Sequence, residues 1–296
     1  MITTKTRFIA KIKKHIFSYY LVAPLLIFLG VVLFYPILHT IFLSFTSIRL
    51  VGSKEFHFVG LENYIVFCKG PHFWSVLRNT IVYTFFVVVG SYFIGLGLAV
   101  LMNINLPGQK FFRIIFLVPW GIPVVAASLI WIYMMNYQTG VLNFLLESIG
   151  LQPVNWLGST NYAMLSVLLV RWWITVPLTS MVLFGGLQTV PKSIIEAARI
   201  DGATNSQVFW YVIMPILKPI SAVLILLLTI WASNDFSLIF ILTEGGPAMA
   251  TTNITLETYF SAFKYIDFGR AAAVAGISLL WSGCFSVLYL KQLFGK

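Results

Sequence analysis

Residues 16–48, with the sequence IFSYYLVAPLLIFLGVVLFYPILHTIFLSFTSI, decide the fold, because they contain no Lys, Arg, Asp or Glu. A helix crosses the hydrocarbon core of a bilayer with roughly 20 mostly apolar residues, so this stretch is long enough to span a membrane. It is too long for the apolar region of a signal peptide, and no small-residue cleavage site follows it. We therefore expect it to be a retained membrane span near the N-terminus.

The composition of the whole chain agrees with a membrane location. Of 296 residues, 19 are Lys or Arg and 9 are Asp or Glu, so 9% are charged, whereas soluble domains contain about 25%. Hydrophobic residues make up 59%, and the mean hydropathy is +0.91. So few polar side chains cannot cover a surface exposed to water, which excludes a soluble enzyme, a disordered chain and a nucleic-acid binder. The net charge of +10 is attributed to membrane lipid as its partner.

Stretches nearly free of charge predict an all-α integral membrane protein, because helices satisfy their own backbone hydrogen bonds in hydrocarbon. By length, about six transmembrane helices are expected, at 17–45, 79–103, 114–135, 163–187, 207–232 and 271–290. Tryptophan and tyrosine side chains lie mostly near the ends of these spans, as in an interfacial belt. Prolines inside the spans fit kinked helices in a bundle.

The positive charges predict the orientation of the spans. Five basic residues precede the first span and supply half of the net charge, at Lys5, Arg7, Lys11, Lys13 and Lys14. Basic residues concentrate on the cytoplasmic side, so both termini are predicted to lie in the cytoplasm. The expected divisions are a basic arm at 1–16, a transmembrane domain at 17–290 and a cytoplasmic tail at 291–296.

The chain carries no motif for chemistry of its own. Residues 186–193 look like a phosphate-binding loop, but Pro191 occupies the place of the glycine before the lysine, and proline has no amide to donate. Cys68, Cys284 and four histidines show no metal-ligand spacing. We expect no catalytic residue, no metal and no cofactor bound by this chain.

Charged and polar residues inside the spans mark candidate sites, because each is costly in hydrocarbon. Arg171 lies well inside a predicted span with no evident acid or histidine companion, so it either snorkels to the interface or lines a pathway. Asn234 and Asp235 end the fifth span and are candidates to face a polar cavity. Polar positions in one helix bundle, without a nucleotide-binding site, indicate a transport pathway whose energy source lies outside this chain.

The predicted cytoplasmic loop at 188–206 has the features of a short helix followed by a stop. Pro191 suits a first helical turn, and Gly202 suits a left-handed helix end. Asn205 is expected to cap the helix that follows. The small residues Ala197 and Ala198 permit close approach by another surface, although an amphipathic connector lying on the membrane is the alternative.

The wording of this loop, GLQTVPKSIIEAARIDGA at 186–203, resembles the EAA signature of binding-protein-dependent ABC importer permeases, in the form of the carbohydrate-uptake branch. Two further segments resemble the same family: GLENY at 60–64 with the following Phe73, Trp74, Asn79 and Thr80, and LTEGGP at 242–247 with Thr251 and Thr252. The resemblance therefore runs across nearly the whole chain in the expected order.

The resemblance implies one permease subunit of an ATP-driven importer in a bacterial or archaeal plasma membrane. Its implied partners are a second homologous permease, two cytoplasmic ATP-binding subunits that hold ATP and Mg, and an extracytoplasmic solute-binding protein. The loop would form a coupling helix between the fourth and fifth spans and dock on the ATPase. The implied coupling residues are Glu196, Ala197, Ala198, Asp201 and Gly202.

A sugar pathway needs hydrogen-bonding groups together with flat apolar faces. Asn234, Asp235 and Ser237 resemble polar positions of the larger maltose permease, and aromatic faces are available at Trp172, Trp173 and Trp231, with Arg171 as the charged candidate. The competing hypotheses are a secondary transporter and a membrane-embedded enzyme. A secondary transporter would show midplane carboxylates and paired halves, and an enzyme would need a catalytic pair within the membrane. The sequence shows neither.

Overall fold

The computed structural model describes residues 16–48, 57–104 and 108–294. The basic arm before residue 16, the start of the first external segment at 49–56 and the last two tail residues lie outside the described residues. Within the described ranges the chain is helical, without a strand and with one isolated β-bridge between Thr46 and Phe58. The helices are α2 (Ile16–Leu29), η1 (Gly30–Phe34), α3 (Tyr35–Ser44), α4 (Glu62–Lys69), α5 (Phe73–Met102), α6 (Gln109–Gly121), α7 (Val124–Met134), α8 (Val141–Ser148), α9 (Ala163–Leu187), α10 (Lys192–Ile200), α11 (Asn205–Gln207), η2 (Val208–Ile213), α12 (Met214–Ser233), α13 (Ser237–Thr243), α14 (Ile254–Tyr259), η3 (Phe260–Lys264) and α15 (Phe268–Phe294).

The expected membrane architecture is confirmed. Five helical segments are long and apolar enough to cross a membrane, and α6 with α7 forms a sixth if the bent pair counts as one span. The third predicted span, 114–135, is not one straight helix, because α6 and α7 meet at 95°. Pro123 disfavours helix at the residue before it, and Ile122 accordingly takes an extended conformation at φ −79° and ψ 129°.

Two spans contain a π-helical segment just before a proline. The segment η1 ends shortly before Pro36, and η2 ends shortly before Pro215. Proline cannot donate a backbone hydrogen bond, and its ring collides with the carbonyl four residues earlier. The preceding turn widens in response, so each span stays continuous while changing its hydrogen-bond register.

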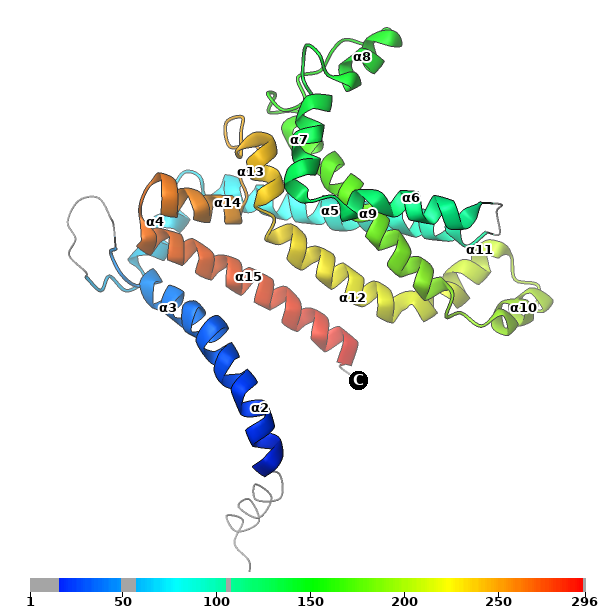
Figure 1. The fold of residues 1–296 in the computed structure, drawn as a ribbon, viewed down its shortest axis with the longest axis horizontal. Coiled ribbons are helices and arrows are strands. Elements are labelled where there is room, and N and C mark those ends of the chain that lie inside the picture. Colours follow the sequence, from blue (N-terminus) through cyan, green and yellow to red (C-terminus); the bar gives the residue numbers. More distant parts are fainter. Residues whose placement is uncertain (1–15, 49–56, 105–107, 295–296) are drawn as a thin grey trace, which may run out of the picture.

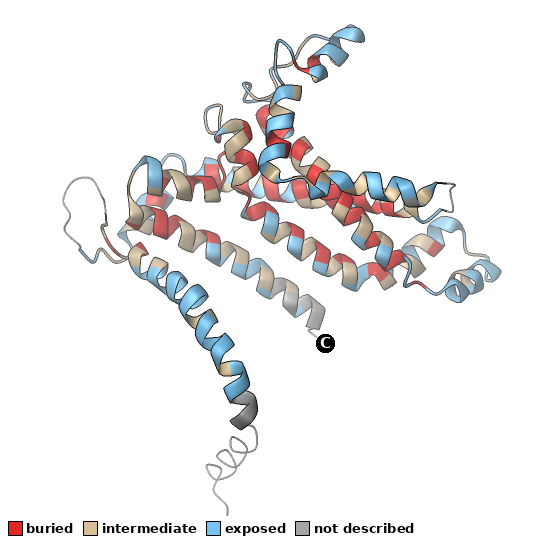
Figure 2. Ribbon diagram, in the orientation of Figure 1, coloured by how far each residue is buried: buried red, intermediate tan, exposed pale blue. Residues whose placement is uncertain are grey.

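The bundle is built around the pair α5 and α9, with α12 packed beside them (Figure 1). Small residues let the first two helices approach closely, as is usual between membrane helices. A Cβ added at Gly90 would lie 2.3 Å from the ring of Trp172, and one at Gly95 would lie 2.6 Å from Thr179. Figure 2 shows the buried residues gathered along these helices, so the core of the chain lies here.

The two ends of the bundle differ. The helix α10 lies at one end, where α9 finishes and η2 leads into α12, while α4 and α14 lie at the opposite end (Figure 1). Helices α5 and α15 start at the α14 end and run toward the α10 end, whereas α12 runs the other way (Figure 1). We call these the α10 end and the α14 end.

The first span stands apart from the bundle. None of its most apolar window is buried, and Figure 1 shows α2 diverging from the other helices. Only its far end is anchored, where α3 packs on α15. There the Asn63 side chain donates to the backbone carbonyls of Ser44 at 2.9 Å and Thr46 at 2.8 Å, and the Tyr64 hydroxyl donates to the Ser44 hydroxyl at 2.8 Å.

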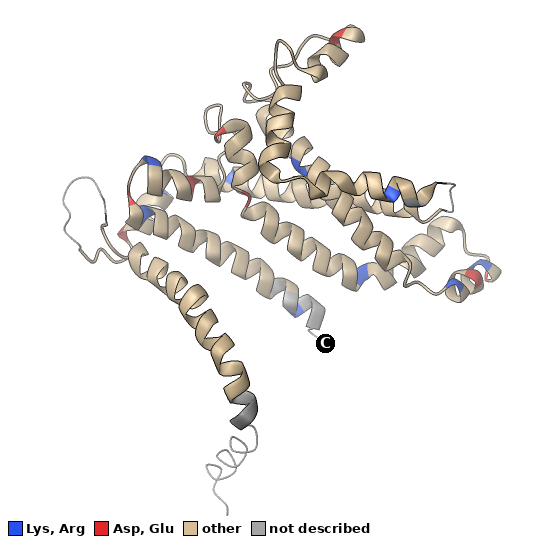
Figure 3. Ribbon diagram, viewed as in Figure 1, with Lys and Arg blue, Asp and Glu red and all other residues tan. Residues whose placement is uncertain are grey.

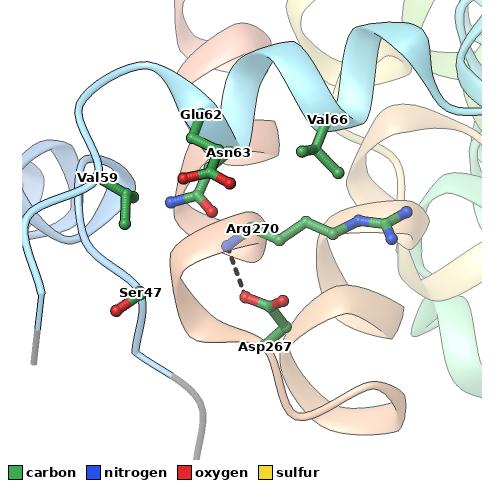
Figure 4. Close-up of a pocket in the computed structure, with 7 residues that line it drawn as sticks. All are labelled: Ser47, Val59, Glu62, Asn63, Val66, Asp267 and Arg270. Carbon is green, nitrogen blue, oxygen red and sulfur yellow. Dashed lines mark hydrogen bonds between the residues drawn. The ribbon is translucent and has the colours of Figure 1, made fainter. Parts of the chain in front are cut away.

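A polar pocket of about 240 Å³ lies beside this anchor (Figure 4). The Arg270 amide donates to the Asp267 carboxylate at 2.9 Å, while the Arg270 guanidinium reaches away and pairs with Glu257 at 2.7 Å. The side chain of Glu257 is 1% exposed, so this ion pair ties α14 to the start of α15. The pocket is lined by Ser47, Val59, Glu62, Asn63, Val66, Asp267 and Arg270.

Candidate functional site

The predicted coupling loop forms a free-standing helix at the α10 end. The helix α10 has no buried residue, and Ile194 is 45% and Ile200 is 86% exposed. Glu196 and Asp201 are exposed and form no ion pair within the described part of the chain. Figure 3 shows basic and acidic residues side by side on this short helix. Apolar and charged groups are thus both presented without a covering element.

The end of α10 is closed by a left-handed glycine. Gly202 has φ +85°, and its amide donates to the Arg199 carbonyl at 3.1 Å. The Ala203 amide donates to the Ala198 carbonyl at 2.9 Å. These two hydrogen bonds form a Schellman motif, which satisfies carbonyls that the helix leaves unpaired. Gly202 therefore ends α10 as the sequence predicted. At the other end of α10, Pro191 is the N-cap residue and does not lie inside the first helical turn.

The next helix begins differently from the prediction, because Thr204 is the cap and Asn205 is not. The Thr204 hydroxyl accepts from the Gln207 amide at 3.3 Å, and the Gln207 side chain accepts from the Thr204 amide at 2.8 Å. This reciprocal pair is a capping box, which satisfies two backbone donors instead of one. The capping box therefore defines where α11 begins after the 188–206 loop.

The candidate pathway residues lie at a break between α12 and α13. Helix α12 ends at Ser233 and α13 begins at Ser237. Asn234 is exposed, and its side-chain amide donates to the Ile230 carbonyl at 2.8 Å and to the Ser282 hydroxyl at 3.3 Å. Ser237 is half-buried in the first turn of α13.

Asp235 differs from its neighbours because its carboxylate points into the bundle. Its Oδ2 atom accepts a hydrogen bond from the Tyr83 hydroxyl at 2.6 Å and lies 3.4 Å from Arg171 Nε. Arg171 therefore has an acidic companion, and the expectation that it lacked one is wrong. Neither the carboxylate nor the guanidinium is a snorkelling group, because their side chains are only 6% and 14% exposed.

The aromatic candidates are divided among several structural contacts. The Trp172 indole donates to the Phe86 carbonyl at 2.9 Å, and the Trp173 ring meets Trp131 edge-on at a centroid distance of 5.7 Å. Trp231 is 42% exposed. Trp172 and Trp173 therefore join α9 to α5 and α7, while Trp231 keeps a free face on α12.

Several residues at this break were missed by the sequence reasoning. Tyr83 carries no signal in the sequence, because it is one of many aromatics in an apolar span. Asn253 caps α14 by accepting from the Leu256 amide at 2.9 Å, and its side-chain amide donates to the Asp235 carbonyl at 2.7 Å. An asparagine just before a short helix was a signal for the cap, but nothing in the sequence predicted its contact with the Asp235 carbonyl.

The fold and these two regions define a class of protein. The chain is a multi-pass membrane protein with a polar break inside its bundle and an uncovered amphipathic helix at one end. Such an arrangement suits a pore-forming subunit that receives its movement from another protein.

Comparison with known proteins identifies the class further. Residues 91–296 match the family described as "Binding-protein-dependent transport system inner membrane component". The chain is 33% identical over 271 residues to the sulfoquinovosyl glycerol transport system permease protein SmoG of Agrobacterium fabrum, covering 92% of this chain and 88% of that one. It is 34% identical over 275 residues to the trehalose/maltose transport system permease protein MalF of Thermococcus litoralis, covering 93% and 92%. A solved bacterial ABC transporter that imports the acidic polysaccharide alginate has the same fold, with a TM-score of 0.82, 19% identity, and coverage of 97% and 98%.

The chain therefore belongs to the family of binding-protein-dependent transport system inner membrane components. It is a multi-pass inner membrane protein and a permease subunit of an ABC importer, not an enzyme. Its partners are those of the family: a binding protein, a second permease subunit and ATP-binding subunits.

Proposed function

We propose that this chain forms half of the translocation pathway for a carbohydrate or carbohydrate-like solute, with the other half supplied by a second permease. The observation that carries the proposal is the uncovered helix α10, which presents Ile194 and Ile200 beside charged side chains at the end of the bundle. Apolar side chains at such exposure beside free charges fit an interface with another protein.

In this proposal α10 is the coupling helix. Glu196 pairs with a basic group of the ATPase, because it is exposed and has no ion pair within the described residues. Ala197 and Ala198 lie against the wall of the docking cleft, and Asp201 belongs to the same surface. Gly202 turns the chain away from it. ATP and Mg are bound by the partner subunits, and this chain binds no cofactor.

The solute class rests on the relatives. Those compared above are named for transport of sulfoquinovosyl glycerol and of trehalose and maltose, which share sugar hydroxyl groups. We propose that Asn234 and Ser237 supply hydrogen-bonding groups to such a solute, and that Trp231 supplies an apolar face, since this ring is 42% exposed.

We further propose that both termini and α10 lie on the cytoplasmic side. Helices α5, α9 and α15 run toward the α10 end, and α12 runs away from it, which is the alternation that six spans require (Figure 1). The transmembrane domain then covers 17–290, between the basic arm at 1–16 and a cytoplasmic tail at 291–296. The α14 end faces the binding protein.

Co-purification of the complex tests the coupling role. The chain is expressed with its partner permease and ATPase, and the ATPase recovered in detergent is measured. Glu196→Ala is expected to reduce that recovery, whereas the matched control Glu147→Ala, an exposed acid on α8, is expected to leave it unchanged. Recovery of the permease pair without any ATPase would overturn the coupling role.

Transport by the reconstituted complex tests the rest of the proposal. Proteoliposomes containing ATP are supplied with the cognate binding protein and a panel of mono- and oligosaccharides and sugar phosphates. Uptake of a carbohydrate that requires both ATP and the binding protein is the expected result. Uptake by the chain alone without ATP would show that the mechanism is secondary transport.

A further inference from the structure

The chain leaves the helical conformation between α12 and α13, and in a membrane protein the backbone groups freed at such a break need partners from protein or water. Two of its backbone carbonyls accept hydrogen bonds from side chains at the start of α14. The Asn253 side chain donates to the Asp235 carbonyl at 2.7 Å, and the Thr255 hydroxyl donates to the Ser233 carbonyl at 3.3 Å. The start of α14 therefore closes the break from one side.

Helix α5 holds the same region from a second side. The Tyr83 hydroxyl donates to the Asp235 carboxylate at 2.6 Å, and one turn earlier the Thr80 hydroxyl accepts from the Ile254 amide at 2.9 Å. Helix α9 supplies the third side through Arg171, whose Nε lies 3.4 Å from the same carboxylate oxygen. One carboxylate thus joins three spans at the point where α12 stops.

These side chains are buried, so the Asp235 and Arg171 charges need partners to offset their desolvation. Tyr83 is 1% exposed, and the side chains of Asp235 and Arg171 are 6% and 14% exposed. A buried charge is tolerated when an opposite charge and hydrogen bonds offset its desolvation. Here one Arg and one Asp offset each other, so removal of either leaves an uncompensated charge inside the bundle.

The residues on either side of Asp235 point elsewhere. Asn234 is exposed and directed toward Ser282 of α15, and Ser237 is half-buried in the first turn of α13. Asp235 is held from within the bundle by Tyr83 and Arg171, and Asn234, the residue before it, is left on the exposed side. The Asp235 side chain is only 6% exposed, which leaves little of its surface for a solute to contact.

We propose that Tyr83, Arg171 and Asp235 are positioning residues: they hold the break between α12 and α13 and thereby set the direction of Asn234 and Ser237, without contacting solute themselves. The inference rests on the proposed function, because it assigns Asn234 and Ser237 to the solute path. It changes the roles of Arg171 and Asp235 from solute contacts to supports.

Thiol accessibility measures this positioning without knowledge of the solute. The reporter is Ser237→Cys in a background with Cys68→Ser and Cys284→Ser, in the complete reconstituted complex, and the probe is a small cationic methanethiosulfonate. Tyr83→Phe keeps the ring and removes the hydrogen bond to a charged group, so the reaction rate at the reporter is expected to change about tenfold. The direction of the change depends on whether the freed turn opens or closes on the thiol, so either direction supports the proposal.

Tyr92→Phe is the matched control. Tyr92 is on the same helix and 7% exposed, and its hydroxyl donates to Ser221 of α12 at 2.9 Å, away from the break. This variant is expected to leave the labelling rate unchanged. Asp235→Asn and Arg171→Gln alone should change the rate, and the neutral double variant should move it back toward the parent.

The outcomes distinguish a positioning role for Tyr83, Arg171 and Asp235 from direct contact with solute. Equal rates in the parent, Tyr83→Phe and Tyr92→Phe complexes would overturn the positioning role, and so would a change of equal size in both variants. A Tyr83→Phe complex that labels as the parent but imports less solute per ATP would assign these residues to solute contact instead. Failure of the ATPase to associate would refute the proposed function, and the labelling rates of the same variants would then be compared in the reconstituted permease alone. If the Arg171 variants do not assemble, the two tyrosine variants decide the question.

Discussion

Replacement of Gly202 tests whether the shape of α10, the proposed coupling helix, matters for docking as well as its side chains. Gly202 has φ +85°, and a Cβ built there would have no neighbour within 4 Å. Substitution therefore creates no collision, and its whole effect comes from the backbone conformation. This separation of strain from packing makes the expected magnitude calculable.

A left-handed conformation costs an L-residue with a Cβ about 1–2 kcal/mol. If docking requires the Schellman turn, Gly202→Ala should weaken association with the ATPase by about 5- to 30-fold. Asparagine visits the left-handed region more readily than other residues, so Gly202→Asn should lie between glycine and alanine. Gly202→Val should bind the ATPase most weakly, because a β-branched residue at positive φ is a genuine outlier.

The assay is titration of the purified ATPase onto the permease pair in nanodiscs, with the dissociation constant measured for each variant. Gly185→Ala is the control, since Gly185 is an exposed glycine of α9 that also has open space around its Cβ but lies in an ordinary helix. It is expected to bind as the parent does. Alanine binding as tightly as glycine at position 202, or asparagine binding as weakly as valine, would refute the reasoning.

Three further substitutions have expected outcomes measurable by thermal unfolding in detergent or by hydrogen exchange. Gly90→Ala should destabilise the chain by about 1–3 kcal/mol, because its Cβ would lie 2.3 Å from Trp172, and Trp172→Phe in the same chain should recover part of the loss. Arg270→Met should cost about 3 kcal/mol by leaving Glu257, which is 1% exposed, without its partner, and a stability equal to the parent would show that the pair is dispensable. Thr204→Val should remove the capping box at a cost of about 1 kcal/mol, seen as faster amide exchange in the first turn of α11; unchanged exchange would contradict that role.

The parts of the fold that the sequence predicted are those set by local composition. A long run without charge is a membrane span regardless of what surrounds it, so the predicted span 163–187 coincides with α9. The helix and stop in the 188–206 loop were predictable for the same reason, because Gly202 imposes its turn on its immediate neighbours alone. Even the error at Asn205 was local: Thr204, one residue earlier, completes a reciprocal pair that a single capping residue cannot.

The parts that the sequence did not predict depend on contacts between distant residues. Tyr83 and Asp235 are 152 positions apart, and no pattern in either span relates them. No companion for Arg171 was evident in the sequence because Asp235 follows another span, at a break that α5, α9 and α14 all contact. The bend between α6 and α7 was visible as Pro123, but its angle of 95° depends on how both halves pack.

The first span also bears on how such a protein is made. In water, an apolar helix left uncovered along its length would drive aggregation. Lipid tails are as apolar as leucine, so no hydrophobic driving force makes a helix in the bilayer pack against a neighbouring helix. The helix α2 can therefore enter the bilayer early in synthesis, before α15 and the Asn63 and Tyr64 side chains anchor the end of α3. Insertion of this span and its lateral packing are then separate events in biogenesis, and its uncovered sides are available to helices that are inserted later.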